Sequence, residues 1–189
     1  MKNSYIGQAW LVIVLALAFG AALAGVQAAL APKIAANKLS DTLGQIPALV
    51  PGATSGKAET IGGQTVYRAL NEKGEHVGWM ISARGLGFAD ILDLLVGVNK
   101  DLSRITGLSV LEQKETPGLG DRITEPAWRD QFKGKPTIPD LAVTKTAPKS
   151  DSEVQGITGA TISSVSVVGI VNGAVARLRA ALAEQGEAL

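Results

Sequence analysis

The chain has 189 residues, with 18 basic and 17 acidic side chains and a net charge of +1. This balance argues against a nucleic-acid-binding protein, because such binding requires a clear positive excess. The chain has no cysteine and one histidine, which excludes disulfides, thiolate zinc sites, iron–sulfur clusters and multi-histidine metal sites. Any redox chemistry therefore needs an organic cofactor, and we expect no metal site.

The first element expected is a helix long enough to cross a bilayer. Residues 9–26 (AWLVIVLALAFGAALAGV) contain no charged side chain. At about 1.5 Å per residue they cover roughly 27 Å, close to the hydrocarbon thickness of a membrane. Tyr5 and Trp10 lie near the start of the run, as aromatic residues do at a membrane interface. A cleaved signal peptide is the alternative, with Lys2 as its basic start and Ala22-Leu23-Ala24 or Val26-Gln27-Ala28 as the cut site.

We expect a retained membrane anchor at residues 1–31, because the apolar run is long and a helical stalk follows it. Stalk and linker are expected at residues 32–57, since PKIAANKLSDTLGQIPAL reads as a helix and PGATSGK is rich in turn residues. The soluble domain is then residues 58–189. Lysines on both sides of the apolar run are near balance, so the positive-inside rule does not fix the orientation.

The soluble part reads as strands joined by short turns, followed by helices. Apolar and alternating patterns predict strands at residues 65–70, 76–83, 91–98, 105–113 and 141–145. The short turns predict antiparallel pairing. A short helix is expected from Pro126 to Phe132. A longer helix is expected at residues 165–184, where one apolar stripe comprises Val168, Val171, Val175, Leu178 and Leu182. The expected fold class is α+β, an antiparallel sheet with packed helices.

Small and hydroxyl-bearing residues crowd the segment before the long C-terminal helix. They are Thr158, Gly159, Ala160, Thr161, Ile162, Ser163 and Ser164. The unpaired N–H groups and the dipole at a helix start favour an anion, so a bound phosphate is one interpretation. Local capping is the other, because Ser and Thr begin helices for their own backbone hydrogen bonds.

A second motif, KETPGLGD at residues 114–121, directly follows a predicted strand. Pro117 and Gly118 suit the middle of a type II turn, in which Gly118 takes a positive φ. Such a loop can present Glu115 and Thr116 to a ligand, or it can be an ordinary surface turn. The sequence does not contain the other common nucleotide-binding motifs. Gly85-x-Gly87 lacks the third glycine of a dinucleotide fingerprint, and no Walker sequence is present.

The order and spacing of these motifs resemble a known family. ETPGLGD after a GLSVLEQ strand, with TGATISS about forty residues further on, is similar to the FMN-binding domain found in the G subunit of Rnf-type electron transport complexes. The C subunit of the sodium-pumping NADH:quinone oxidoreductase is a close relative of that protein. The resemblance runs from about Val66 to Ala176.

The resemblance implies that a flavin transferase attaches FMN covalently to Thr161, through a phosphoester between the threonine oxygen and the FMN phosphate. Thr158, Gly159 and Ala160 surround that position, and Ser163 and Ser164 are expected to donate to the phosphate. Gly118 and Leu119 are expected to approach the isoalloxazine ring, with Glu115 and Thr116 framing it. No residue is assigned a catalytic role, since the flavin does the chemistry.

Two positions depart from the family pattern. Gln155 stands six residues before Thr161, where the family usually has an acidic residue, which affects recognition by the transferase. Asp90 ends a GxGY-type segment where proline is more common. Among other candidates, we expect His76 to be a solvated or hydrogen-bonded strand residue. Asp90 and Asp93 are expected to face solvent rather than a partner subunit, and Trp79 and Trp128 to pack in the core rather than stack on the flavin.

The function implied is a membrane-anchored flavoprotein subunit. It relays electrons through covalent FMN in an Rnf-type complex that couples ferredoxin and NAD oxidoreduction to ion translocation. The expected location is the cytoplasmic membrane, single-pass, with the domain outside the cytoplasm. Partners are the other membrane subunits and the flavin transferase. One alternative is a stand-alone membrane-tethered flavoprotein that donates electrons to an extracytoplasmic reductase. Another is a flavin-free structural or assembly subunit.

Overall fold

The structure is a computed structural model that describes residues 5–186, with side chains from residue 9 onward. The expectations for Lys2 and for the Tyr5 side chain therefore lie outside the described residues. The chain divides into two compact units, Met1–Leu43 and Gly44–Leu189.

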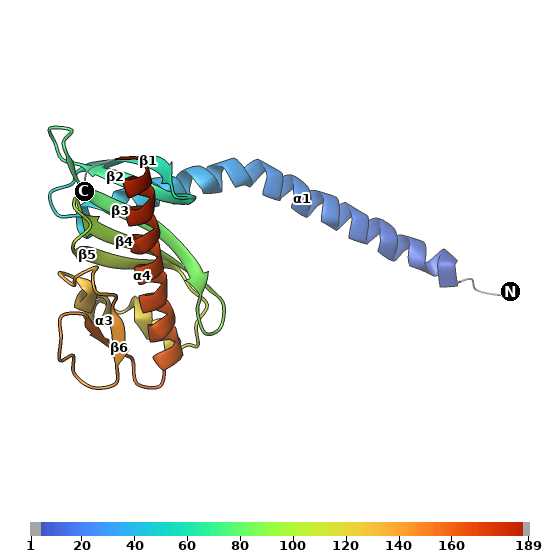
Figure 1. The fold of residues 1–189 in the computed structure, drawn as a ribbon. Helices are drawn as coiled ribbons and strands as arrows, with labels where there is room; N and C mark the ends of the chain where they lie inside the picture. The colour runs from blue at the N-terminus through green and yellow to red at the C-terminus, as the bar shows by residue number, and fades with distance from the viewer. Residues whose placement is uncertain (1–4, 187–189) are drawn as a thin grey trace. The chain divides into compact units, whose positions relative to one another are not determined.

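The N-terminal unit is formed by one helix, α1 (Tyr5–Gly44), which is 40 residues long (Figure 1). The expected anchor and residues 32–44 of the expected helical stalk lie on this continuous helix, which contains Pro32. Residues 46–49 of the expected stalk form a separate short helix. Its apolar side chains between Trp10 and Leu39 are exposed. By length and composition α1 can cross a membrane, with a mean hydropathy of 2.5 in its most apolar stretch. The predicted apolar N-terminal helix is thus confirmed.

A five-stranded antiparallel sheet is the framework of the second unit, as the sequence predicts. The strands follow chain order across the sheet: β1 (Ser55–Ile61), β2 (Gln64–Leu70), β3 (His76–Leu86), β4 (Ile91–Asn99) and β5 (Ile105–Glu112). Strand β1 was not predicted, because SGKAETI carries little apolar surface and most of its residues are exposed or half-exposed at the sheet edge. Strand β3 also runs through Gly85, where a break was expected.

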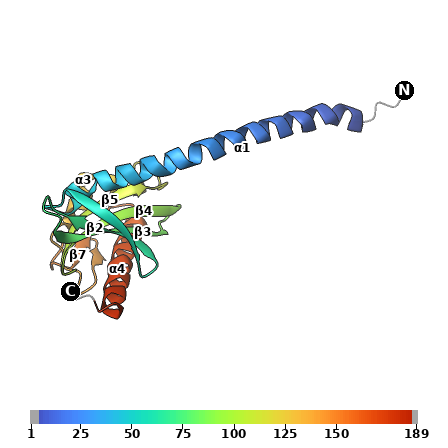
Figure 2. The same cartoon turned by 90° about the horizontal axis from the view of Figure 1, so that it is seen from above.

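Helix α4 (Thr161–Glu184) crosses one face of the sheet (Figures 1 and 2). It begins four residues before the expected start at residue 165. The predicted stripe from Val168 to Leu182 is buried, and it packs with the side chains of β3 and β4 that point to the same face, among them Trp79, Leu94 and Val96. Helix α4 is also long and apolar enough to span a membrane, but this buried stripe identifies it as a core helix of the domain.

A smaller segment connects β5 to α4. It contains η1 (Gly120–Thr124), α3 (Pro126–Arg129), η2 (Asp130–Phe132) and the strands β6 (Ala142–Thr144) and β7 (Glu153–Gln155). The expected helix at residues 126–132 is thus one α-helical turn followed by a 3₁₀ turn. Strand β7 was not predicted, and it pairs in parallel with β6. The Trp128 indole N–H donates to the carbonyl of Gln155 at 2.8 Å, and this hydrogen bond connects α3 to β7.

A short helix, α2 (Ile46–Leu49), packs against the other face of the sheet. Four sheet glycines make room for this segment, and we call them the glycine saddle: Gly56, Gly78, Gly97 and Gly107. A Cβ atom added at Gly97 would lie 2.3 Å from the carbonyl oxygen of Leu49, and one at Gly78 would lie 2.7 Å from Val50. Residues 46–50 are therefore part of the domain. The compact unit begins at Gly44, earlier than the residue 58 expected from sequence.

Candidate functional site

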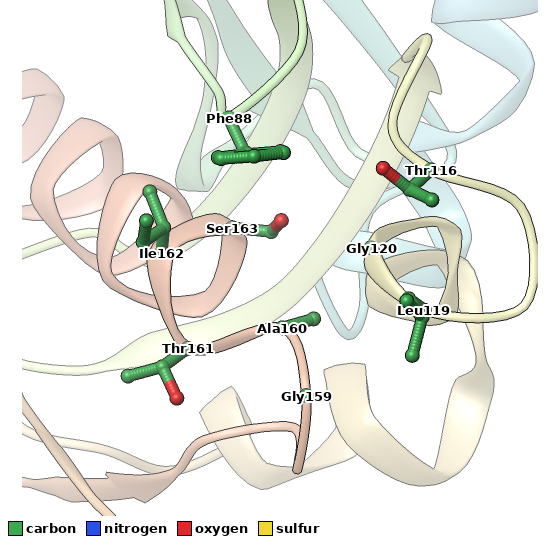
Figure 3. A pocket seen from close by; sticks show the side chains of 9 residues that line it. All are labelled: Phe88, Thr116, Leu119, Gly120, Gly159, Ala160, Thr161, Ile162 and Ser163. Carbon is green, nitrogen blue, oxygen red and sulfur yellow. The ribbon is translucent and has the colours of Figure 1, made fainter.

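A cavity of about 430 Å³ lies where three distant segments of the domain meet (Figure 3). One wall comes from the turn between β3 and β4, a second from the loop after β5, and a third from the start of α4. The lining residues are Phe88, Thr116, Leu119, Gly120, Gly159, Ala160, Thr161, Ile162 and Ser163. Its volume lies within the range of roughly 300–1,000 Å³ that is usual for small-molecule sites.

The N-terminus of α4 opens onto this cavity without a capping side chain. The N-cap residue is Ala160, which makes no side-chain cap hydrogen bond. Gly159, with φ +86°, turns the chain into the helix, and Thr161 is the first helical residue and is exposed. The first N–H groups of a helix have no partner within it and attract anions. No side chain therefore caps the helix at Ala160, and binding of an anion at this helix start stays a prediction.

The two serines of the motif have a different role from the one expected. Both are buried. The Ser163 hydroxyl donates to Oε2 of Glu115 at 2.6 Å. The Ser164 hydroxyl donates to the carbonyl of Ala160 at 3.0 Å and accepts from the N–H of Ile157. Their hydroxyls are therefore used in hydrogen bonds within the protein, whereas the first backbone N–H groups of a helix have no acceptor within it.

Glu115 lies behind the cavity wall rather than in it. Its side chain is buried, with only 4% of its surface exposed, and it does not line the cavity. The neighbouring Thr116 and Leu119 do line it. Gly118 has φ +74°, the positive value predicted for the turn, and it is exposed outside the lining set. The loop thus supplies Thr116 and Leu119 to the cavity, and Glu115 to its support.

Three exposed apolar side chains give the cavity its character. Phe88 is 59% exposed, Ile162 58% and Leu119 45%, and all three line the cavity (Figure 3). Apolar walls of this kind suit a flat aromatic ligand. Sequence reasoning did not assign Phe88, Ile162 or Gly120 to the site. For Phe88 the signal was available, because it occupies the aromatic position of the GxGY-type segment.

Ion pairs hold the turn beside the cavity. The Lys114 ammonium lies 3.1 Å from the Asp90 carboxylate. The pKa of Asp90 is lowered, first by the N–H of Ile91 and then by Lys114. Asp90 correspondingly raises the pKa of Lys114. Asp93 pairs with Arg84 at 3.1 Å. Both aspartates are partly exposed, and whether they face solvent or a partner subunit stays a prediction.

The remaining candidates have structural roles. The His76 ring hydrogen-bonds the carbonyl of Gly78 at 3.0 Å and meets Trp79 edge-on at 4.5 Å, so it is the hydrogen-bonded strand residue expected. Trp79 is buried in the sheet core. Trp128 packs on Phe132 with ring centroids 5.3 Å apart. Neither tryptophan lines the cavity, and both pack as expected.

Comparison with known proteins points to the same region. Residues 87–176 match the family described as FMN-binding domain, and this range contains every lining residue of the cavity. The chain is 38% identical over 109 residues to the G subunit of the ion-translocating oxidoreductase complex of Methanosarcina acetivorans, covering 58% of this chain and 55% of the relative. It is 39% identical over 101 residues to the G subunit of the Na(+)-translocating ferredoxin:NAD(+) oxidoreductase complex of Acetobacterium woodii, covering 52% and 48%.

A solved structure shares the fold. The crystal structure of Shewanella oneidensis NqrC is similar with a TM-score of 0.53 at 23% identity, over 69% of this chain and 70% of that chain. The chain spans about half the length of the first two curated relatives. The expected α+β fold, an antiparallel sheet with packed helices after an apolar N-terminal helix, is confirmed.

Proposed function

We propose, from the premise that residues 87–176 belong to the FMN-binding domain family, that this chain is a membrane-anchored electron carrier with FMN in the cavity described above. The observation that carries this proposal is a cavity with an uncapped helix N-terminus at one side and exposed apolar side chains around it. That pairing matches the two ends of FMN, an anionic phosphate and a flat aromatic ring.

The residues present fit this cofactor. The start of α4 at Thr161 offers backbone N–H groups and the positive end of the helix dipole to a phosphate. Phe88, Leu119 and Ile162 offer apolar surface to the ring and exclude water from its faces. Bound FMN supplies the electron-transfer chemistry, and the protein sets its position and environment. This supports an electron carrier rather than a flavin-free structural subunit.

Covalent attachment at Thr161 is the finer part of the proposal. Thr161 is exposed, lines the cavity and begins the helix, so its hydroxyl is accessible to a flavin transferase. A phosphoester there keeps the phosphate at the helix N-terminus. Thr158 and Gly159 precede it on the surface, where a modifying enzyme can reach them. The bond keeps the carrier from losing its cofactor between oxidation states.

The setting proposed is a multi-subunit ion-translocating complex in the cytoplasmic membrane. The two relatives described above are named as G subunits of ion-translocating oxidoreductase complexes, and α1 is long and apolar enough to anchor the chain in a single pass. We place the FMN-binding domain outside the cytoplasm, where a covalent bond retains a cofactor that is not otherwise supplied. Other membrane subunits then deliver and accept the electrons.

Expression of the chain with a flavin transferase tests the proposal. Wild-type protein should show the added mass of an FMN phosphoester, and fluorescence of the denatured band in a gel. Thr161→Ala should lose both, because the acceptor oxygen is gone. Thr146→Ala removes an exposed hydroxyl outside the site and should keep both. Retention of the adduct in Thr161→Ala would contradict attachment at this residue. Purification from native membranes separates the complex from a stand-alone flavoprotein, since only the former brings further membrane subunits.

A further inference from the structure

We infer that Glu115 is a positioning residue for the flavin. Its buried carboxylate ties together the three walls of the cavity and places a fixed negative charge behind them. This inference rests on the proposed function for its effect on the cofactor. The hydrogen bonds that support it belong to the protein alone.

The two carboxylate oxygens of Glu115 bind two different walls. Oε1 accepts from the backbone N–H of Phe88 at 2.8 Å and of Ala89 at 3.1 Å, which holds the turn between β3 and β4. Oε2 accepts from the hydroxyl of Ser163 at 2.6 Å, which holds the first turn of α4. Glu115 itself lies in the loop after β5, which also carries Thr116 and Leu119. One side chain therefore connects all three segments that line the cavity.

Two glycines make the space that this carboxylate occupies. A Cβ atom added at Gly87 would lie 2.2 Å from Oε1 of Glu115. One added at Gly120 would lie 2.8 Å from Oε2 and 2.9 Å from the Ser163 hydroxyl. A side chain at either position would push the carboxylate out of reach of its donors. The carboxylate thus lies between the backbone of Gly87 and that of Gly120, and only 4% of the Glu115 surface is exposed.

The charge of Glu115 has an effect separate from its hydrogen bonds. A buried negative charge acts through a lower effective dielectric than water and is weakly screened by salt. It disfavours the electron-rich reduced flavin relative to the oxidised one, so it lowers the reduction potential. The substitution Glu115→Gln separates the effect of the charge from the effect of the hydrogen bonds. Its carbonyl can accept from Phe88 and Ala89 and its amide can donate to the Ser163 oxygen, which preserves the connections and removes the charge.

The flavin-free chain tests the connections first. Glu115→Ala leaves two N–H groups and one hydroxyl without their acceptor, so its thermal unfolding midpoint should fall clearly below that of wild type. Ser163→Ala should show a smaller fall, because one of the three bonds is lost. Glu125→Ala is the control, since Glu125 is exposed and pairs only at the surface with Arg122. Equal midpoints for Glu115→Ala and Glu125→Ala would overturn the inference.

The flavin-loaded full chain then tests positioning. Intact mass first establishes that wild type, Glu115→Gln and Ser163→Ala carry FMN, and a wild type without the adduct would refute the proposed function instead. Ser163→Ala should lower the flavin fluorescence anisotropy, because the helix start is released from the turn. Glu115→Gln should keep the wild-type anisotropy and shift the midpoint potential to a more positive value. A wild-type potential in Glu115→Gln, or a wild-type anisotropy in Ser163→Ala, would overturn the inference.

Discussion

Replacing Gly97 by alanine tests whether α2 is an integral part of the domain. Gly97 lies in β4 under the α2 segment, and an added Cβ would lie 2.3 Å from the Leu49 carbonyl oxygen and 2.7 Å from the Thr106 hydroxyl. The first of these atoms is backbone, so it can move only if α2 moves. The second atom donates to that same carbonyl. One methyl group therefore displaces α2 and breaks a hydrogen bond.

The expected cost follows from these contacts. Overpacking in a well-packed region costs about 1–3 kcal/mol, and the lost hydrogen bond adds about 1 kcal/mol. Replacement of glycine by alanine stabilises the folded state by roughly 0.5–1 kcal/mol, because it reduces the conformational entropy of the unfolded chain. The net loss in the free energy of unfolding is about 1–3.5 kcal/mol. For a chain of this size that corresponds to a fall in the unfolding midpoint of roughly 2–14 °C.

Thermal unfolding of the full chain in detergent, followed by circular dichroism, measures the change. Gly169→Ala is the matched control, because Gly169 is an exposed residue of α4 with no atom within 4 Å of an added Cβ. It should stabilise the protein by about 0.5–1 kcal/mol, since alanine is the better helix former. An unchanged midpoint for Gly97→Ala beside a stabilised Gly169→Ala would show that α2 does not hold the position described here.

Three further outcomes are expected. A chain of residues 44–189 should fold and take up FMN, whereas residues 58–189 should not fold, because that chain lacks α2 and the first residues of β1; comparison of their amide NMR spectra checks this. Gln155→Glu should raise the rate of FMN attachment, because it restores an acidic side chain at an exposed position of the motif; timed mass spectrometry with purified transferase measures it. Asp90→Asn should be less stable than wild type at neutral pH. That difference should vanish in acid, because the folded pKa of Asp90 is lowered and its contribution is lost as the pH falls through that value; denaturant titrations from pH 7 to below 3.8 test it.

The sheet and the long helix could be predicted because their patterns are strong. Strands β2 to β5 carry apolar residues in period two or in unbroken runs, and the α4 stripe recurs at helical spacing. Strand β1 and strand β7 lack these signals, since SGKAETI is mostly polar and EVQ is only three residues long. Residues 46–49 were expected to be helical as part of the stalk, but their packing against the sheet was not predicted. The glycine saddle that receives α2 is spread over four strands, and no local pattern reveals that the glycines share a face.

The candidate site was located by its motifs but not resolved in its detail. Thr161, Thr116 and Leu119 line the cavity, and their binding of FMN stays a prediction. Glu115 and Ser163 were both assigned to the ligand. Ser163 lines the cavity, but its hydroxyl donates to Glu115, which does not line it. That pairing joins residues 48 positions apart, and nothing in either local sequence indicates it. The start of α4 was placed too late for a similar reason, because its first turn is set by contacts with the loop after β5.

The three-segment origin of the cavity has a consequence for a cofactor bonded to Thr161. Unfolding separates Phe88, Leu119 and the start of α4 and so destroys the surface proposed to bind FMN, but the proposed phosphoester would keep the flavin on the chain. Rebinding is then intramolecular, at an effective concentration on the order of millimolar for a short tether. A single molecule can thus lose and regain its native fold without drawing on a free pool of FMN.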